Sequence, residues 1–148
     1  MRRQAFIFDI DGTISDCEHR VHFIRGEGKK DWAGFYAAQV DDPPIPHMVK
    51  LCRTLAIQHP VVFVTGRPED YRAPTFAWLT RHVTDDFDSL YMRAAGDFRD
   101  DGIVKVELMH RVVKDGYEPV LAFEDRSRVV SAYRAAGFPC AQIAPGDF

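Results

Sequence analysis

The sequence lacks the features that mark secreted, membrane-bound and zinc-finger proteins. Its three cysteines, Cys17, Cys52 and Cys140, lie far apart and are odd in number, which fits neither a disulfide framework nor a zinc motif. No apolar stretch approaches the length of a membrane span, and the apolar run near the N-terminus is too short for a signal peptide. We therefore expect a soluble cytoplasmic protein with no membrane partner.

An excess of positive charge is also absent. The chain carries 19 lysines and arginines against 22 acidic residues, which gives a net charge of −3. This balance excludes a protein that coats nucleic acid through its overall charge, because such binding needs a large positive potential. A local basic groove remains compatible with the composition.

Internal repeats, low-complexity segments and a nucleotide-binding P-loop are missing as well. The segment GEGKKDW at 26–32 has neither the spacing of the GxxxxGK[ST] motif nor a strand before it. We therefore expect no kinase domain. A chain of 148 residues buries one good core, so we predict a single domain over residues 1–148.

Short apolar runs alternate with helical patterns along the chain. The runs are rich in Val, Ile and Phe with little polar alternation, as in strands that are covered on both faces, and they lie at 4–8, 61–64, 89–92, 120–124 and 140–144. Helical patterns follow at 45–59, from about Pro74, at 102–116 and at 127–137, where Ser127 is the expected N-cap. This order predicts an α/β fold with a doubly wound, Rossmann-like, five-stranded parallel sheet.

Residues 16–45 interrupt this alternation after the first strand. About 30 residues cannot hold a core of their own, so we interpret them as a small cap insertion rather than a domain. Phe23, Trp32, Phe35 and Tyr36 have helix-like spacing there. Packing against the body of the protein is the favoured explanation, and stacking on the end of a DNA or RNA strand stays open.

Polar residues follow the predicted strands where each one ends. The first strand runs into Asp9-Ile10-Asp11-Gly12-Thr13, the second into Thr65-Gly66-Arg67, and the fourth into Glu124-Asp125, while Lys105 lies on the helix after the third. Ligands bind at the carboxyl ends of the strands in open parallel sheets. These groups are therefore expected to converge on one edge of the sheet.

Carboxylates that converge in this way repel each other and need a compensating cation. Mg²⁺ prefers oxygen ligands such as those of Asp9 and Asp125. An Asp9 oxygen can then attack phosphorus and form an aspartyl-phosphate, while Asp11 protonates the leaving oxygen and later deprotonates water. Thr65 and the Gly66 N–H can bind phosphate oxygens, and Lys105 can neutralise the transferred group.

These motifs resemble the four motifs of the haloacid dehalogenase (HAD) superfamily of phosphohydrolases. The resemblance extends to the 3′-phosphatase domains of bacteriophage polynucleotide kinase–phosphatases, through Arg20, the RDDGIVKVEL and LAFEDRSRVV stretches and the terminal APGDF. It implies Asp9 as the nucleophile and Asp11 as the acid–base. It also implies phosphate or substrate contacts from Thr65, Gly66, Lys105, Arg20 and Arg67, and metal ligands among Asp9, Asp11, Asp125 and Glu124.

One departure from that family concerns the acidic pair. The family carries two aspartates where this chain has Glu124-Asp125. Glutamate is longer by one methylene group, which leaves open whether Glu124 binds the metal directly or through water.

The expected activity is that of a Mg²⁺-dependent phosphomonoesterase acting on the 3′-phosphate ends of DNA or RNA, hence end repair. A basic rim for neighbouring phosphates is expected from Arg20, Arg25, Lys29, Lys30, Arg67 and Arg72. Surface salt bridges would explain the presence of Arg20 and Arg67 about as well as substrate binding does.

Two alternative functions stay open. One is a nucleotidase or other small-metabolite phosphatase of the superfamily, and the other is a non-catalytic binding module. The sequence also leaves a homo-oligomer open.

Overall fold

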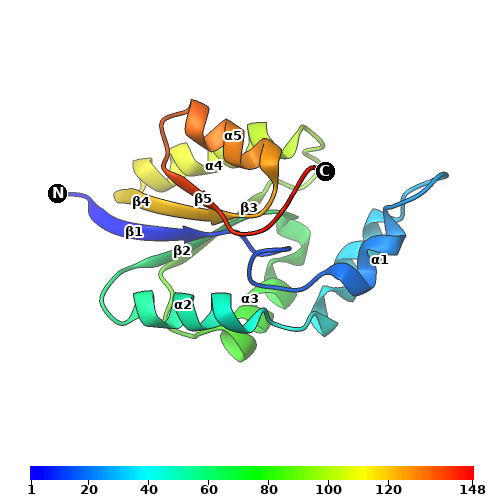
Figure 1. The fold of residues 1–148 in the computed structure, drawn as a ribbon, viewed down its shortest axis with the longest axis horizontal. Helices are drawn as coiled ribbons and strands as arrows, with labels where there is room; N and C mark the ends of the chain where they lie inside the picture. Colours follow the sequence, from blue (N-terminus) through cyan, green and yellow to red (C-terminus); the bar gives the residue numbers. More distant parts are fainter.

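A five-stranded, entirely parallel sheet forms the centre of the molecule (Figure 1). The computed structural model describes all residues from 1 to 148. The strands are β1 (Arg3–Phe8), β2 (Val61–Pro68), β3 (Ser89–Arg93), β4 (Tyr117–Glu124) and β5 (Cys140–Gln142), and their order in the sheet is β3-β2-β1-β4-β5. The predicted doubly wound α/β architecture is confirmed.

Helices cover both faces of this sheet. Figure 1 shows α4 (Asp101–Lys114) and α5 (Ser127–Ala135) on one face, and α2 (Pro46–Ala56) and α3 (Arg72–His82) on the other. Successive residues of β1 point to opposite faces, so Ile7 packs in the core under α4 and α5 while Phe8 packs in the core under α2 and α3. Both faces are buried, which explains the apolar runs without polar alternation.

Several boundaries differ from the sequence prediction by one to four residues, and β4, for example, begins at Tyr117 rather than at 120. Strand β2 continues to Pro68, so Thr65-Gly66-Arg67 forms the end of the strand rather than the loop after it. Helix α2 ends at Ala56 rather than at His59. Ser127 is the first residue of α5 and not its N-cap, because its hydroxyl donates to Asp147 Oδ1 at 3.1 Å instead of accepting from the helix.

The cap segment, residues 16–45, lies beyond the carboxyl ends of the strands, around α1 in Figure 1. It contains a 3₁₀-helix at Glu18–Phe23, helix α1 (Trp32–Ala37) and a second 3₁₀-helix at Ala38–Asp41. Asp31 caps α1 by accepting from the Gly34 N–H at 2.9 Å. None of the helices in the fold has the length and apolar character required to cross a bilayer.

Candidate active site

Asp9 lies directly after the central strand β1, and both of its carboxylate oxygens are held. Lys105 Nζ donates to Oδ1 at 2.6 Å, and Thr13 Oγ1 donates to Oδ2 at 2.9 Å. Asp9, Thr13 and Lys105 are all buried. The side chain therefore has one orientation, at the carboxyl edge of the sheet.

Three buried carboxylates meet at this point, and we call Asp9, Glu124 and Asp125 the carboxylate cluster. One oxygen from each lies within 4.8 Å of the others. Lys105 Nζ also donates to Glu124 Oε2 at 2.7 Å, and no second cation is in contact with the three carboxylates. Burial and the nearby charge of Asp9 raise the pKa of Glu124 well above its usual value and the pKa of Asp125 to about 7.

The carboxylate cluster fits a divalent cation such as Mg²⁺. Its donors are all oxygen atoms, which hard cations prefer, and the negative charge of three carboxylates exceeds that of the single lysine. The residues that would hold the ion are Asp9 and Asp125, with Glu124 partly engaged by Lys105.

The backbone after β1 approaches Asp125 so closely that a side chain has no room. Gly12 has a φ of +80°, and a Cβ atom built there would lie 2.1 Å from Asp125 Oδ2. L-residues with a side chain rarely adopt this conformation. The glycine of the DIDGT motif therefore allows the loop that carries Asp9 to lie against the loop that carries Asp125.

Asp11 points away from the carboxylate cluster, towards two arginines. Arg20 Nη2 donates to its Oδ1 at 2.5 Å, and Arg67 Nη2 donates to the same oxygen at 2.6 Å. Burial alone would raise the pKa of Asp11, but the two guanidinium groups outweigh it and hold the pKa well below the usual range. The carboxylate that we expected among the metal ligands is thus bound by arginines in this structure.

Arg20 and Arg67 are themselves buried, with 0% and 1% of their surface exposed. The buried carboxylate of Asp42 accepts from Arg20 Nε at 2.7 Å, from Arg20 Nη2 at 2.6 Å and from Arg67 Nη2 at 3.4 Å. Our expectation that these two arginines contribute to an exposed basic rim is wrong, because neither guanidinium reaches the surface. Exposed positive charge on the cap segment comes instead from Arg25, Lys29 and Lys30.

Sequence reasoning missed Asp42. It lies in the sequence Asp41-Asp42-Pro43-Pro44, where nothing separates the buried aspartate from its exposed neighbour Asp41. A buried pair of arginines requires a carboxylate partner, but the burial of Arg20 and Arg67 is visible only in the structure, so the sequence held no signal for Asp42.

The end of β2 lies against α4. Thr65 is buried, and its Oγ1 accepts from the Arg67 N–H at 3.2 Å. A Cβ atom at Gly66 would lie 2.2 Å from Asp101 Oδ1, so a larger residue at this position would displace the Asp101 side chain. Asp101 was not singled out from the sequence, yet its Oδ2 lies 3.9 Å from Lys105 Nζ at the base of the site.

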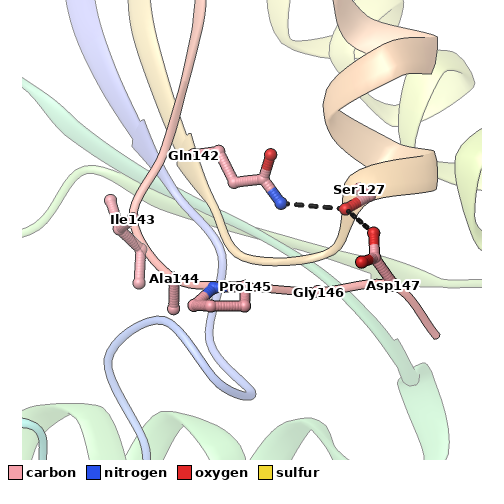
Figure 2. Close-up of a pocket in the computed structure, with 7 residues that line it drawn as sticks. All are labelled: Ser127, Gln142, Ile143, Ala144, Pro145, Gly146 and Asp147. Atoms are coloured by element: carbon pink, nitrogen blue, oxygen red, sulfur yellow. Dashed lines mark hydrogen bonds between the residues drawn. The ribbon is translucent and has the colours of Figure 1, made fainter.

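The C-terminal segment supports the loop that carries Asp125. Figure 2 shows Gln142 donating to Ser127 Oγ, and Ser127 donating to Asp147. These residues line a surface hollow of about 450 Å³. Gln142 Nε2 also donates to the Asp125 carbonyl oxygen at 2.9 Å. A Cβ atom at Gly146 would lie 1.9 Å from that oxygen. The hollow contains no candidate catalytic side chain, so we assign this segment to positioning Asp125.

The chain matches the family described as "Polynucleotide kinase PNKP phosphatase domain" over residues 3–148. A protein of Autographa californica nuclear polyhedrosis virus, described as a bifunctional polynucleotide kinase/RNA ligase, is 23% identical over 92% of this chain and 18% of its own length.

Solved structures share the fold. A chain in the Pnkp1/Rnl/Hen1 complex is 28% identical, with a TM-score of 0.85 over 99% of this chain and 47% of that chain. A haloacid dehalogenase-like hydrolase from Streptococcus pneumoniae is 15% identical, with a TM-score of 0.70 over 93% of this chain and 83% of that chain. The protein thus spans less than half of the first of these chains and about a fifth of the viral protein.

Proposed function

Because the chain belongs to the family of polynucleotide kinase PNKP phosphatase domains, we propose that it removes the 3′-phosphate from polynucleotide ends, using Mg²⁺ and a phospho-Asp9 intermediate. The observation that carries this proposal is the buried carboxylate cluster with Lys105 beside Asp9. Asp11 lies two residues further along the chain and accepts hydrogen bonds from Arg20 and Arg67.

In the first step one carboxylate oxygen of Asp9 attacks phosphorus, and the bond from phosphorus to the 3′-oxygen breaks. Asp11 donates a proton to that leaving oxygen. Asp11 is ionised when it faces only the two arginines. The negative charge of an arriving phosphate raises its pKa, and Asp11 takes up a proton from the solvent, which it then donates to the leaving oxygen.

In the second step Asp11 takes a proton from water, which attacks phosphorus and releases Asp9 and inorganic phosphate. Thr65 and the Gly66 N–H bind phosphate oxygens, and Lys105 offsets their charge. A bound Mg²⁺ supplies additional positive charge for the phosphate oxygens and for the carboxylate cluster.

A polymer end is favoured over a small metabolite by the size of the cap segment. About 30 residues are too few to enclose the site as a separate domain would. Exposed Lys29 and Lys30 supply positive charge on the cap segment for a backbone phosphate. The chain's similarity to part of the Pnkp1/Rnl/Hen1 RNA repair complex supports an RNA end in particular.

Turnover of a panel of phosphomonoesters tests this function. The panel contains 3′-phosphate and 5′-phosphate oligonucleotides of DNA and RNA, a 3′-mononucleotide and an aryl phosphate. We expect kcat/KM to be at least about tenfold higher for a 3′-phosphate oligonucleotide than for the 3′-mononucleotide, because contacts to neighbouring nucleotides add binding energy of about 1.4 kcal/mol or more. A preference for the mononucleotide would establish a nucleotidase, and no phosphate release with Mg²⁺ from any substrate would establish a binding module.

Mg²⁺ is expected to stabilise the fold. A cation that binds the folded protein at about 100 times its Kd adds about 2.7 kcal/mol, which corresponds to a rise of roughly 5–10 °C in Tm for a domain of this size. Differential scanning fluorimetry with Mg²⁺, and with NaCl at equal ionic strength, measures the shift. Asp125→Asn should remove most of it, and Asp85→Asn, an exposed aspartate outside the site, should retain it. An equal rise in both variants would contradict a metal site at the carboxylate cluster.

A further inference from the structure

Three aromatic rings pack in a row where the cap segment meets the segment after β2, and we call Trp32, Tyr36 and Tyr71 the ring stack. The Trp32 and Tyr36 rings have centroids 5.9 Å apart and planes 26° apart. Tyr36 and Tyr71 have centroids 5.1 Å apart and planes 35° apart. Two rings come from α1 and the third from the segment after β2, so the fold, not the local sequence, assembles the stack.

The middle ring of the ring stack, Tyr36, lies on the helix that packs against the arginine bound to Asp11. Burial and the negative charge of Asp11 together raise the pKa of Tyr36 to about 12. Phe35 connects the same helix to the site, because the Arg20 guanidinium carbon lies 4.3 Å from the Phe35 ring centroid while Arg20 binds Asp11.

Core packing explains Phe35 but not Trp32. Phe35 is 7% exposed, whereas Trp32 leaves 46% of its surface exposed at the outer end of the ring stack. Its ring also meets Phe35 edge-on, at 5.8 Å between centroids, which holds its orientation. An oriented aromatic face that stays exposed next to an active site is available to a planar ligand.

Positive charge accompanies this exposed ring. Lys30 Nζ lies 5.7 Å from the Trp32 centroid, and Lys29 next to it is exposed. The protein as a whole carries a charge of −3, so this charge is local. A flat apolar face with flexible ammonium groups beside it is complementary to a nucleobase with its phosphodiester, since every base offers a ring face and every linkage a negative charge.

We propose that the ring stack binds nucleobases at the 3′ end of the polynucleotide, with a base lying on Trp32 while the terminal phosphate faces Asp9. This inference rests on the proposed function and names the part of the substrate that the cap segment recognises. Stacking is tolerant of sequence, so the site selects unpaired bases without selecting their identity. The side chain of Lys30 moves from the ring to a neighbouring phosphate when the base binds.

Abasic substrates test the ring stack. For wild-type protein we expect kcat/KM for a 3′-phosphate oligonucleotide to exceed that for the same oligonucleotide with abasic terminal positions by about 5–100-fold, the range that stacking of one base supplies. Trp32→Ala should reduce this ratio to near one, and Trp32→Phe, which keeps a ring, should restore part of it. Phe76→Ala removes a similarly exposed ring, 49% exposed on α3, and should leave the ratio unchanged.

Tryptophan fluorescence provides a readout that does not depend on turnover. The chain has two tryptophans, and Trp78 is buried, so iodide quenches Trp32 selectively. In Asp9→Asn protein, a 3′-phosphate oligonucleotide should protect Trp32 from iodide and its abasic counterpart should not.

The outcomes separate the two proposals. If the protein hydrolyses oligonucleotides but Trp32→Ala leaves the ratio of kcat/KM between the intact and the abasic substrate unchanged, the proposed role of the ring stack is wrong. The proposed phosphatase activity then still holds. If no oligonucleotide is hydrolysed, the proposed function fails, and the iodide experiment alone decides the ring stack: base-dependent protection supports it, and equal protection by both oligonucleotides refutes it.

Discussion

Asp9→Asn is expected to abolish phosphate release, with kcat lower by at least about 10³-fold on every substrate that the protein hydrolyses. An asparagine side chain cannot form the aspartyl-phosphate on which turnover depends. The fold should survive, because the Asn oxygen still accepts from Lys105, its NH2 group can donate to the Thr13 hydroxyl oxygen, and the substitution removes one charge from a crowded cluster. Phosphate release measures the loss, and circular dichroism with thermal melting checks the fold.

Two further observations make the Asp9 experiment specific. Asp16→Asn changes an exposed aspartate of the same loop and should retain full activity. Acid quenching during turnover of a ³²P-labelled ester should leave label on the wild-type protein and none on Asp9→Asn. Substantial activity in the asparagine variant would show that another group is the nucleophile.

Asp42→Ala is expected to cost about 3–5 kcal/mol of unfolding free energy, because it breaks a buried ion pair by removing one partner. The substitution leaves Arg20 without its two Asp42 hydrogen bonds and Arg67 without one, while both guanidinium groups stay buried. Asp11 would then be the one carboxylate for both arginines. Urea unfolding gives the change in free energy.

The neighbouring residue supplies a matched control for Asp42. Asp41→Ala removes an exposed carboxylate one position away and should change stability by no more than about 0.5 kcal/mol. Asp42→Asn keeps the volume and one acceptor oxygen, so it should fold with a smaller loss and with lower activity. Equal stability of Asp42→Ala and Asp41→Ala would contradict the structural role of Asp42.

The sequence was sufficient for the sheet because the signals for it are local. Runs such as VVFV at 61–64 are apolar without alternation, and this pattern arises when helices cover both faces. Strand β2 was predicted too short because Thr65-Gly66-Arg67 carries polar side chains, while tertiary contacts bury its Thr65 and Arg67.

The positions of Asp9 and Asp125 also followed from local information, since both come directly after a strand and parallel strands end at one edge. The resemblance then suggested a role for each, and those roles stay predictions that the variants above test. Lys105 was assigned to phosphate, and the structure adds that Asp9 and Glu124 already bind it in the free protein.

Only the tertiary structure decided the environment of Arg20 and Arg67. Both arginines were compatible with an exposed basic rim, since a charged side chain in a short helical segment or after a strand carries no local sign of burial. Their burial depends on Asp42, which lies 22 residues from Arg20 and 25 from Arg67. The ring stack has the same origin, because Tyr71 joins Tyr36 across 35 residues of chain whose folding no short pattern specifies. Local sequence determined the sheet and the residues at its edge, whereas long-range packing determined which charges are paired and which aromatic face stays exposed.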